Sequence, residues 1–97
     1  MAEDRIRRKK LWQSLGNIKR QIEWLQAAEK LGLTVTGGGG KGSHWAIRNG
    51  KYPISDIRSL VATVQKGLHK KANEKIFKHL LDEGVSEDDI WKALGML

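Results

Sequence analysis

The chain of 97 residues contains no cysteine and no long apolar run. Without cysteine it has neither a disulfide framework nor a thiolate metal site. No stretch approaches the ~18 consecutive apolar residues that suggest a membrane span. The first ten residues, MAEDRIRRKK, are charged with no apolar run behind them, so we expect no secretory signal. These absences favour a single cytoplasmic domain without membrane attachment.

Positive charge is in excess, because 18 Lys plus Arg residues stand against 11 Asp plus Glu, a formal net charge of +7. Such an excess favours a polyanionic partner such as nucleic acid or an acidic protein. The cations crowd the first twenty residues, and the acids gather near the C-terminus at Asp82, Glu83, Glu87, Asp88 and Asp89. This distribution fits nucleic-acid binding or docking on a partner better than membrane binding.

Two helices are expected in the first third of the chain. Residues 4–15 are polar but competent to form a helix, and Gly16-Asn17 interrupt them. Asn17 is a plausible N-cap for the second helix, and Gly32 is typical of the residue that ends one. Apolar residues recur between them at helical spacing, which predicts a buried stripe of Ile18, Ile22, Leu25 and Ala28, with Trp24 and Leu31 at its edge.

Three strands are expected in the middle of the chain. Residues 33–36 alternate apolar and polar side chains, and residues 44–48 follow a glycine-rich turn. Residues 59–65 are ambiguous, because their apolar positions also fit a helix capped by Ser55 and closed by Gly67. We favour the strand, because several of its residues are β-branched and a two-stranded sheet alone would be marginal.

A further helix is expected over residues 73–81, with Ile76, Phe77, Leu80 and Leu81 on one face and Gly84 after its end. Ser86 then begins a capping sequence for a short final helix. The order predicts an α+β two-layer sandwich, α-β-β-β-α, with an extra N-terminal helix and a short C-terminal helix. We divide the chain into a basic N-terminal helical extension, residues 1–16, and a domain of residues 17–97.

The glycine-rich stretch of residues 37–48, GGGGKGSHWAIR, is the strongest candidate for a functional site. Glycine lets a backbone approach another surface closely, although a flexible hairpin loop is the simpler explanation of such a run. It is no P-loop, because Lys41 is followed by Gly42 and the chain continues as a strand rather than a helix. The three histidines share no metal-ligand spacing.

His44 is the candidate catalytic residue. If Trp45 and Ile47 face the helices, the alternation of a strand puts His44 and Arg48 on the open face. An imidazole exchanges protons near neutral pH, so beside RNA it could take the proton of a ribose 2′-OH. Lys41, Arg48 and the backbone N–H groups of the turn could hold the phosphate. This chemistry requires no metal or cofactor, although a histidine at a strand start is more often structural.

The chain resembles the HicA-type toxins of toxin–antitoxin systems. The resemblance covers residues 18–94 and is carried by Gly42-Ser43-His44 before an apolar strand, then Lys70, Lys71 and the run IFKHLLDEGVSEDDIW. It implies a fold like a double-stranded-RNA-binding domain and a metal-independent mRNA interferase activity. It also implies His44 as the catalytic residue and a HicB-type antitoxin as the partner. The predicted RNA-binding residues are Lys41, Gly42, Ser43, Arg48, Lys70 and Lys71.

The chain departs from the family pattern in the second strand, where Trp45 replaces a histidine that many relatives carry. A Pro-x-His that is common near the end of the third strand is also absent from residues 62–66. Two alternatives to an endoribonuclease therefore stay open. One is a non-catalytic RNA-binding module on the same fold, which reads RNA shape. The other is a protein adaptor that uses Trp12, Trp24 and Trp91 as anchors, although such tryptophans are more often core.

Overall fold

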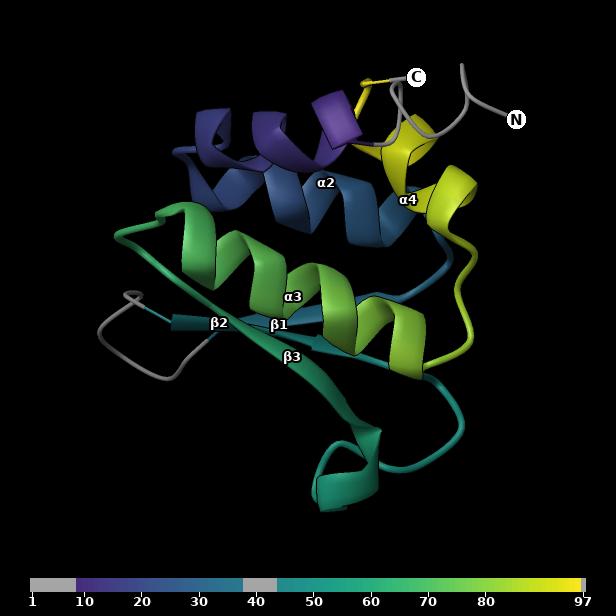
Figure 1. Cartoon of the computed structure of the whole chain (residues 1–97). Coiled ribbons are helices and arrows are strands. Elements are labelled where there is room, and N and C mark those ends of the chain that lie inside the picture. Colours follow the sequence, from purple (N-terminus) through teal and green to yellow (C-terminus); the bar gives the residue numbers. More distant parts are fainter. Residues whose placement is uncertain (1–8, 38–43, 97) are drawn as a thin grey trace.

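A computed structural model describes residues 9–37 and 44–96 of the chain, and Figure 1 shows their arrangement. Residues 9–14 are helical and lead into a short 3-10 helix. In chain order the elements are η1 (Leu15–Asn17), α2 (Gln21–Lys30), β1 (Thr34–Gly37), β2 (His44–Arg48), η3 (Ile57–Ser59), β3 (Leu60–Gln65), α3 (Lys70–Asp82) and α4 (Glu87–Ala93). The fold is α+β, as the sequence predicts.

The three strands form one antiparallel sheet in the order β1-β2-β3, so β2 is central and β3 lies at an edge. Ile47 pairs with Val35 on one side and with Ala62 on the other. A register shift follows between Ile47 and Arg48. Helices α2, α3 and α4 gather on one face of the sheet, whereas η3 lies beside the start of β3 (Figure 1).

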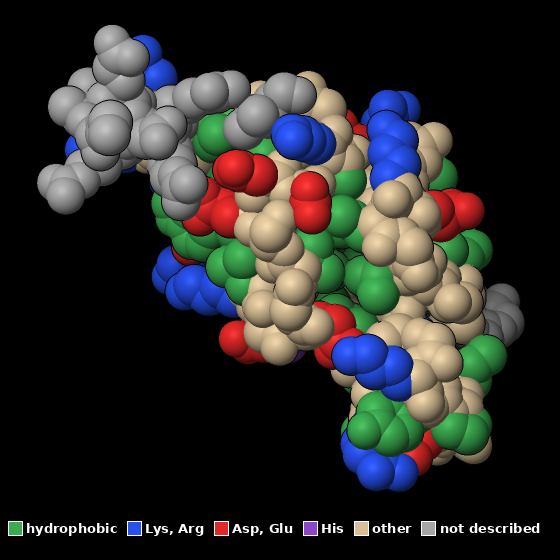
Figure 2. Space-filling model, turned by 90° about the vertical axis from the view of Figure 1, so that its right-hand side faces the viewer, with side chains coloured by type: hydrophobic (Ala, Val, Ile, Leu, Met, Phe, Trp, Pro, Cys, Tyr) green, Lys and Arg blue, Asp and Glu red, His purple; other side chains and the backbone are tan. Residues whose placement is uncertain are grey.

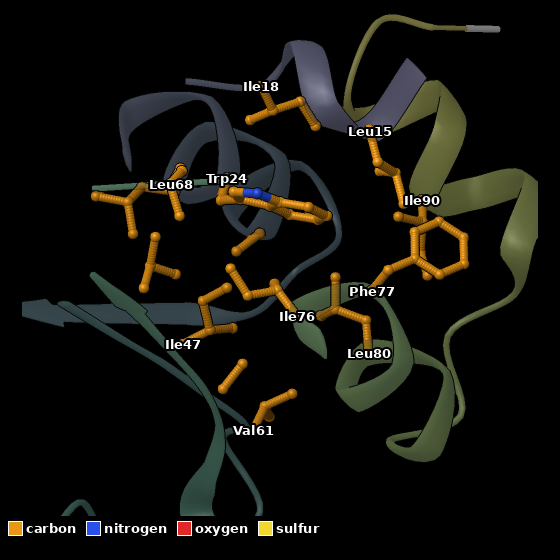
Figure 3. Packing of buried hydrophobic residues seen from close by; sticks show 14 of the residues in the cluster. Leu15, Ile18, Trp24, Ile47, Val61, Leu68, Ile76, Phe77, Leu80 and Ile90 are labelled. Atoms are coloured by element: carbon orange, nitrogen blue, oxygen red, sulfur yellow. The ribbon is translucent and has the colours of Figure 1, made fainter. Parts of the chain in front are cut away.

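The core lies between the helices and this sheet (Figure 3). Ile47 and Val64 enter it from the strands, and Trp24 enters it from α2. The ring of Phe77 lies 4.5 Å from that of Trp91 and 5.2 Å from that of Trp12, measured between ring centroids. Trp24 and Trp91 are 0% and 1% exposed, so neither can anchor a partner at the surface as the adaptor hypothesis requires.

The segment before α2 shares the same core. Leu15 is fully buried in η1, and Trp12 packs against the cluster. Figure 3 shows Leu15 beside Ile90 of α4. Residues 11–15 therefore contribute apolar surface that is continuous with the core of the rest of the chain.

The predicted start of α2 is wrong. Asn17 belongs to η1, and α2 begins after Arg20, whose backbone N–H donates to the carboxylate of Glu23. Ile18 consequently lies outside α2, so the buried face of the helix cannot be counted from this residue. Ile22, predicted to be buried, is 44% exposed, while Trp24 takes the core position.

The strand interpretation of residues 59–65 is confirmed, because β3 spans Leu60–Gln65. The predicted helix ends at Gly32 and Gly84 are also correct, and both glycines adopt positive φ angles of 81° and 101°. Ser86 caps α4 as expected, and its hydroxyl accepts a hydrogen bond from the backbone N–H of Asp89. Helix α3 begins at Lys70, three residues earlier than predicted.

Candidate nucleic-acid interface

His44 is the first residue of β2, and its side chain is exposed. Across the sheet it pairs with Gln65, the last residue of β3. Directly opposed residues of antiparallel strands have Cα atoms about 4.5–5.5 Å apart. The chain then turns from Gln65 into α3, so His44 lies at the end of the sheet where α3 begins (Figure 1).

Lys70 and Lys71 occupy the first turn of α3, which contains no acidic residue. Cations at a helix N-terminus oppose the helix dipole, whereas anions there are favourable. The last helix shows the favourable arrangement, with Glu87, Asp88 and Asp89 in its first turn. The two lysines therefore cost α3 some stability, and this end of the molecule attracts anions.

The two lysines leave α3 in different directions. The side chain of Lys70 runs past Gly16, where a Cβ atom added to the glycine would meet the lysine Cβ at 3.6 Å. Lys71 instead lines a groove beside β3, together with Gln65 and His69. Positive charge therefore lies on the side of α3 that faces Gly16 and on the side next to β3.

His69 has a structural function that the sequence did not reveal. It is the N-cap of α3, and its Nδ1 accepts a hydrogen bond of 3.2 Å from the backbone N–H of Ala72. Histidine is outside the usual set of capping residues, so composition gave no signal for it. A Ser or Asp at this position would have predicted the true start of α3.

Arg48, expected to hold a phosphate beside His44, is engaged elsewhere. Its Nε donates to the hydroxyl of Thr36, and its Nη1 donates to the hydroxyl of Ser59 and to the carbonyl of Ile54. Four residues along a strand also separate it from His44 by about 13 Å. The structure therefore brings Lys70 and Lys71, but not Arg48, to the end of the sheet where His44 lies.

The remaining predicted site residues, Lys41, Gly42 and Ser43, lie outside the described residues. His79 is half-buried, and its Nδ1 lies 3.0 Å from the carbonyl oxygen of Val61. Helix α3 therefore turns this side of its surface toward β3.

Charge is distributed differently on the side of the molecule away from His44. Figure 2 shows the face at the right of Figure 1, where Asp and Glu side chains lie among Lys and Arg. In the loop before β3, a carboxylate oxygen of Asp56 lies 2.7 Å from Arg58. The hydrogen bonds from the Arg58 side chain and backbone N–H lower the pKa of Asp56, and the same carboxylate raises the pKa of Arg58.

No protein-family description, curated protein or solved structure matches the chain. Within residues 9–37 and 44–96, no three His, Asp or Glu side chains lie close enough together to hold a metal ion. None of the helices in those two ranges is both long and apolar enough to cross a bilayer.

Proposed function

We propose that the protein binds RNA at the end of the sheet where β2 begins and α3 starts. The observation that carries this proposal is the first turn of α3, where Lys70 and Lys71 stand against the helix dipole with no acid to offset them. A phosphate group would satisfy both the lysines and the helix terminus. The formal net charge of +7 supports a polyanionic ligand in general.

We further propose that the bound RNA is cleaved, with His44 as the general base. The imidazole takes the proton of a ribose 2′-OH, and the 2′ oxygen attacks the adjacent phosphorus. The bond to the 5′ oxygen breaks, and that oxygen takes a proton from water. The products are a 2′,3′-cyclic phosphate and a 5′-hydroxyl, and no metal takes part. Support comes from the exposure of His44 and its pairing with Gln65, at the end of β3 that leads to α3.

The resemblance to HicA-type toxins agrees with this assignment. It rests on Gly42-Ser43-His44, Lys70 and Lys71, and it carries with it a fold like a double-stranded-RNA-binding domain. A three-stranded antiparallel sheet with helices on one face is compatible with that fold. By the same resemblance, a HicB-type antitoxin is the proposed protein partner.

Cleavage can be tested by incubating the purified protein with RNA in EDTA and analysing the fragment ends. We expect 2′,3′-cyclic phosphates with the wild-type protein and none with His44→Gln. The matched control is His69→Asn, which removes another imidazole at the same end of the molecule but keeps a side chain that can cap α3. Loss of cleavage in the control but not in His44→Gln would reject His44 as the base.

A non-catalytic RNA-binding module is the second candidate. The lysines of α3 favour it equally, because they serve phosphate binding whether or not the RNA is cut. Trp45 is also present where many HicA-type proteins have a second histidine. Intact RNA that remains bound to the wild-type protein in the same assay would favour this candidate over the nuclease.

A further inference from the structure

A groove of about 540 Å³ runs between β3 and α3. Strand β3 is at an edge of the sheet, so no described strand pairs with its outer side. Exposed edges are usually protected by charged side chains or proline, yet the sequence of β3, LVATVQ, contains neither. The register shift between Ile47 and Arg48 disturbs only the start of β3, and residues 62–65 pair regularly with β2.

The groove is lined by apolar side chains from β3 and α3 and by basic side chains along one side of α3. The apolar lining includes Leu60 at the start of β3 and Ala72 and Ile76 of α3. Two of its apolar lining residues, Ile57 and Leu60, are 83% and 37% exposed, so apolar surface near the start of β3 is accessible to a ligand. Accessible apolar side chains are a poor match for a ribose-phosphate backbone.

The basic wall comes from one side of α3, where Lys71, Lys75 and His79 follow at intervals of four residues. Residues at this spacing lie above one another on the same helix face. None of the described residues that line the groove is Asp or Glu. Any ligand that fills the groove therefore meets positive charge on the side of α3 without a competing acid.

From these features we propose that the groove binds an extended, acidic segment of a protein partner as a fourth strand beside β3. The carbonyl of Val61 already contacts His79, and that of Val64 accepts a hydrogen bond from Gln21. Main-chain hydrogen bonds to the remaining outward-facing groups of β3 provide affinity, as in other cases of strand addition, and side-chain pockets provide specificity. The segment alternates aliphatic residues, which face Ala72 and Ile76 of α3, with acidic residues, which point to the other face of the sheet and attract Lys71 and Lys75 over a longer distance at low salt. This proposal does not depend on RNA binding or on cleavage.

The test uses a fluorescent eight-residue peptide that alternates Val or Ile with Glu or Asp, titrated with the full-length protein at low salt. We expect saturable binding, which Lys75→Glu weakens roughly five- to tenfold because an attraction becomes a repulsion. The matched control, Lys78→Glu, makes the same charge change on an exposed residue of α3 that does not line the groove. Lys75 is chosen because Lys71 is also part of the proposed RNA interface.

Strand addition also predicts how N-methylation of the same peptide affects its binding. Adjacent residues of a strand direct their backbone N–H groups to opposite edges. N-methylation of every second amide should therefore abolish binding in one alternation and leave it nearly unchanged in the other. Equal tolerance of both peptides, equal effects of the two Lys→Glu substitutions, or absence of binding would overturn the proposal. So would the finding that duplex RNA, and not the peptide, shifts the NMR signals of β3 and Ile57.

Discussion

Trp24 and Asn73 form a hydrogen bond at the centre of the molecule, in which the indole Nε1 donates to the side-chain carbonyl of Asn73 at 2.9 Å. The Asn73 amide nitrogen in turn donates to the backbone carbonyls of Leu15 and Ile18. Asn73 is fully buried, and every polar atom of its side chain has a partner. This one side chain joins α3 to α2 and to the segment before it.

Replacing Asn73 with Leu should destabilise the protein strongly. The substitution leaves the indole N–H of Trp24 and the carbonyl of Ile18 without the bonds to Asn73, each at a cost of about 1–3 kcal/mol. The carbonyl of Leu15 loses one of its two bonds and keeps the one from the backbone N–H of Ile18. We expect the free energy of unfolding in urea to fall by about 3 kcal/mol or more. Asn17→Leu is the control, because Asn17 is exposed and should change stability by less than about 0.5 kcal/mol. Similar losses in the two variants would show that the buried network contributes little.

Two buried tryptophans allow the hydrogen bond to be separated from the packing. Trp24 donates to Asn73, whereas the Nε1 of the buried Trp91 has no hydrogen-bond partner among the residues that the structure describes. Substitution by Phe removes the same volume at both positions. Only Trp24→Phe also leaves a buried acceptor, the side-chain carbonyl of Asn73, without its donor. We expect Trp24→Phe to lower the free energy of unfolding by about 1–3 kcal/mol more than Trp91→Phe does. An equal loss at both positions in thermal or urea unfolding would contradict this account.

The fold class and the order of the elements could be predicted because both depend on local signals. The β-branched residues of β3, the glycines after α2 and α3, and the Ser86 cap each act within a few positions of the chain. Asn73 shows the limit of that reasoning. Its partners Leu15 and Ile18 are 58 and 55 positions away, so no periodicity identifies a polar residue that belongs in the core.

In the candidate site too, features that depend on local sequence could be predicted, and features that depend on distant residues could not. Strand alternation places His44 on the open face if Ile47 faces the helices, and in the structure Ile47 is buried and His44 is exposed. The function of Arg48 could not be predicted, because it depends on how the loop of residues 49–59 folds back to present Ser59 and the Ile54 carbonyl. The nearness of His44 to α3 likewise depends on the pairing of β2 with β3, which the sequence of either strand alone does not specify.

Arg48 and Lys71 should respond to substitution in opposite ways. Arg48→Met removes three hydrogen bonds within the protein, so we expect a loss of about 1–3 kcal/mol in unfolding free energy and little change in RNA affinity. Lys71→Met removes a cation that opposes the dipole of α3, so stability should hold or rise slightly while RNA affinity falls. Urea unfolding and RNA titration of both variants provide the check. A large affinity loss in Arg48→Met with unchanged stability would restore Arg48 to the RNA interface.

The Asp56–Arg58 pair should make a small contribution to stability that depends on pH. Because the Arg58 side chain lowers the pKa of Asp56, the folded state favours the ionised carboxylate. This contribution is fully present above the ordinary Asp pKa of 3.8 and is lost as the pH falls through the lower folded value. NMR titration of the Asp56 carboxyl carbon should show its pKa rising toward the ordinary value in Arg58→Met. An unchanged titration in that variant would exclude the Arg58 side chain as the cause, because the backbone N–H of residue 58 still donates to Asp56.

The salt dependence of RNA affinity is the most direct test of whether Lys70 and Lys71 contact phosphates. Each lysine that contacts a phosphate contributes about 0.7–0.9 to the slope of log K against log[salt], because binding releases condensed counterions. We expect Lys70→Gln together with Lys71→Gln to reduce the magnitude of this slope by about 1.4–1.8. Substituting Lys78 and Lys92 in the same way removes equal charge from exposed positions outside the first turn of α3 and should leave the slope nearly unchanged. If both double variants lower the slope equally, RNA responds to the overall charge of the protein, and the end of the sheet beside His44 is not its binding site.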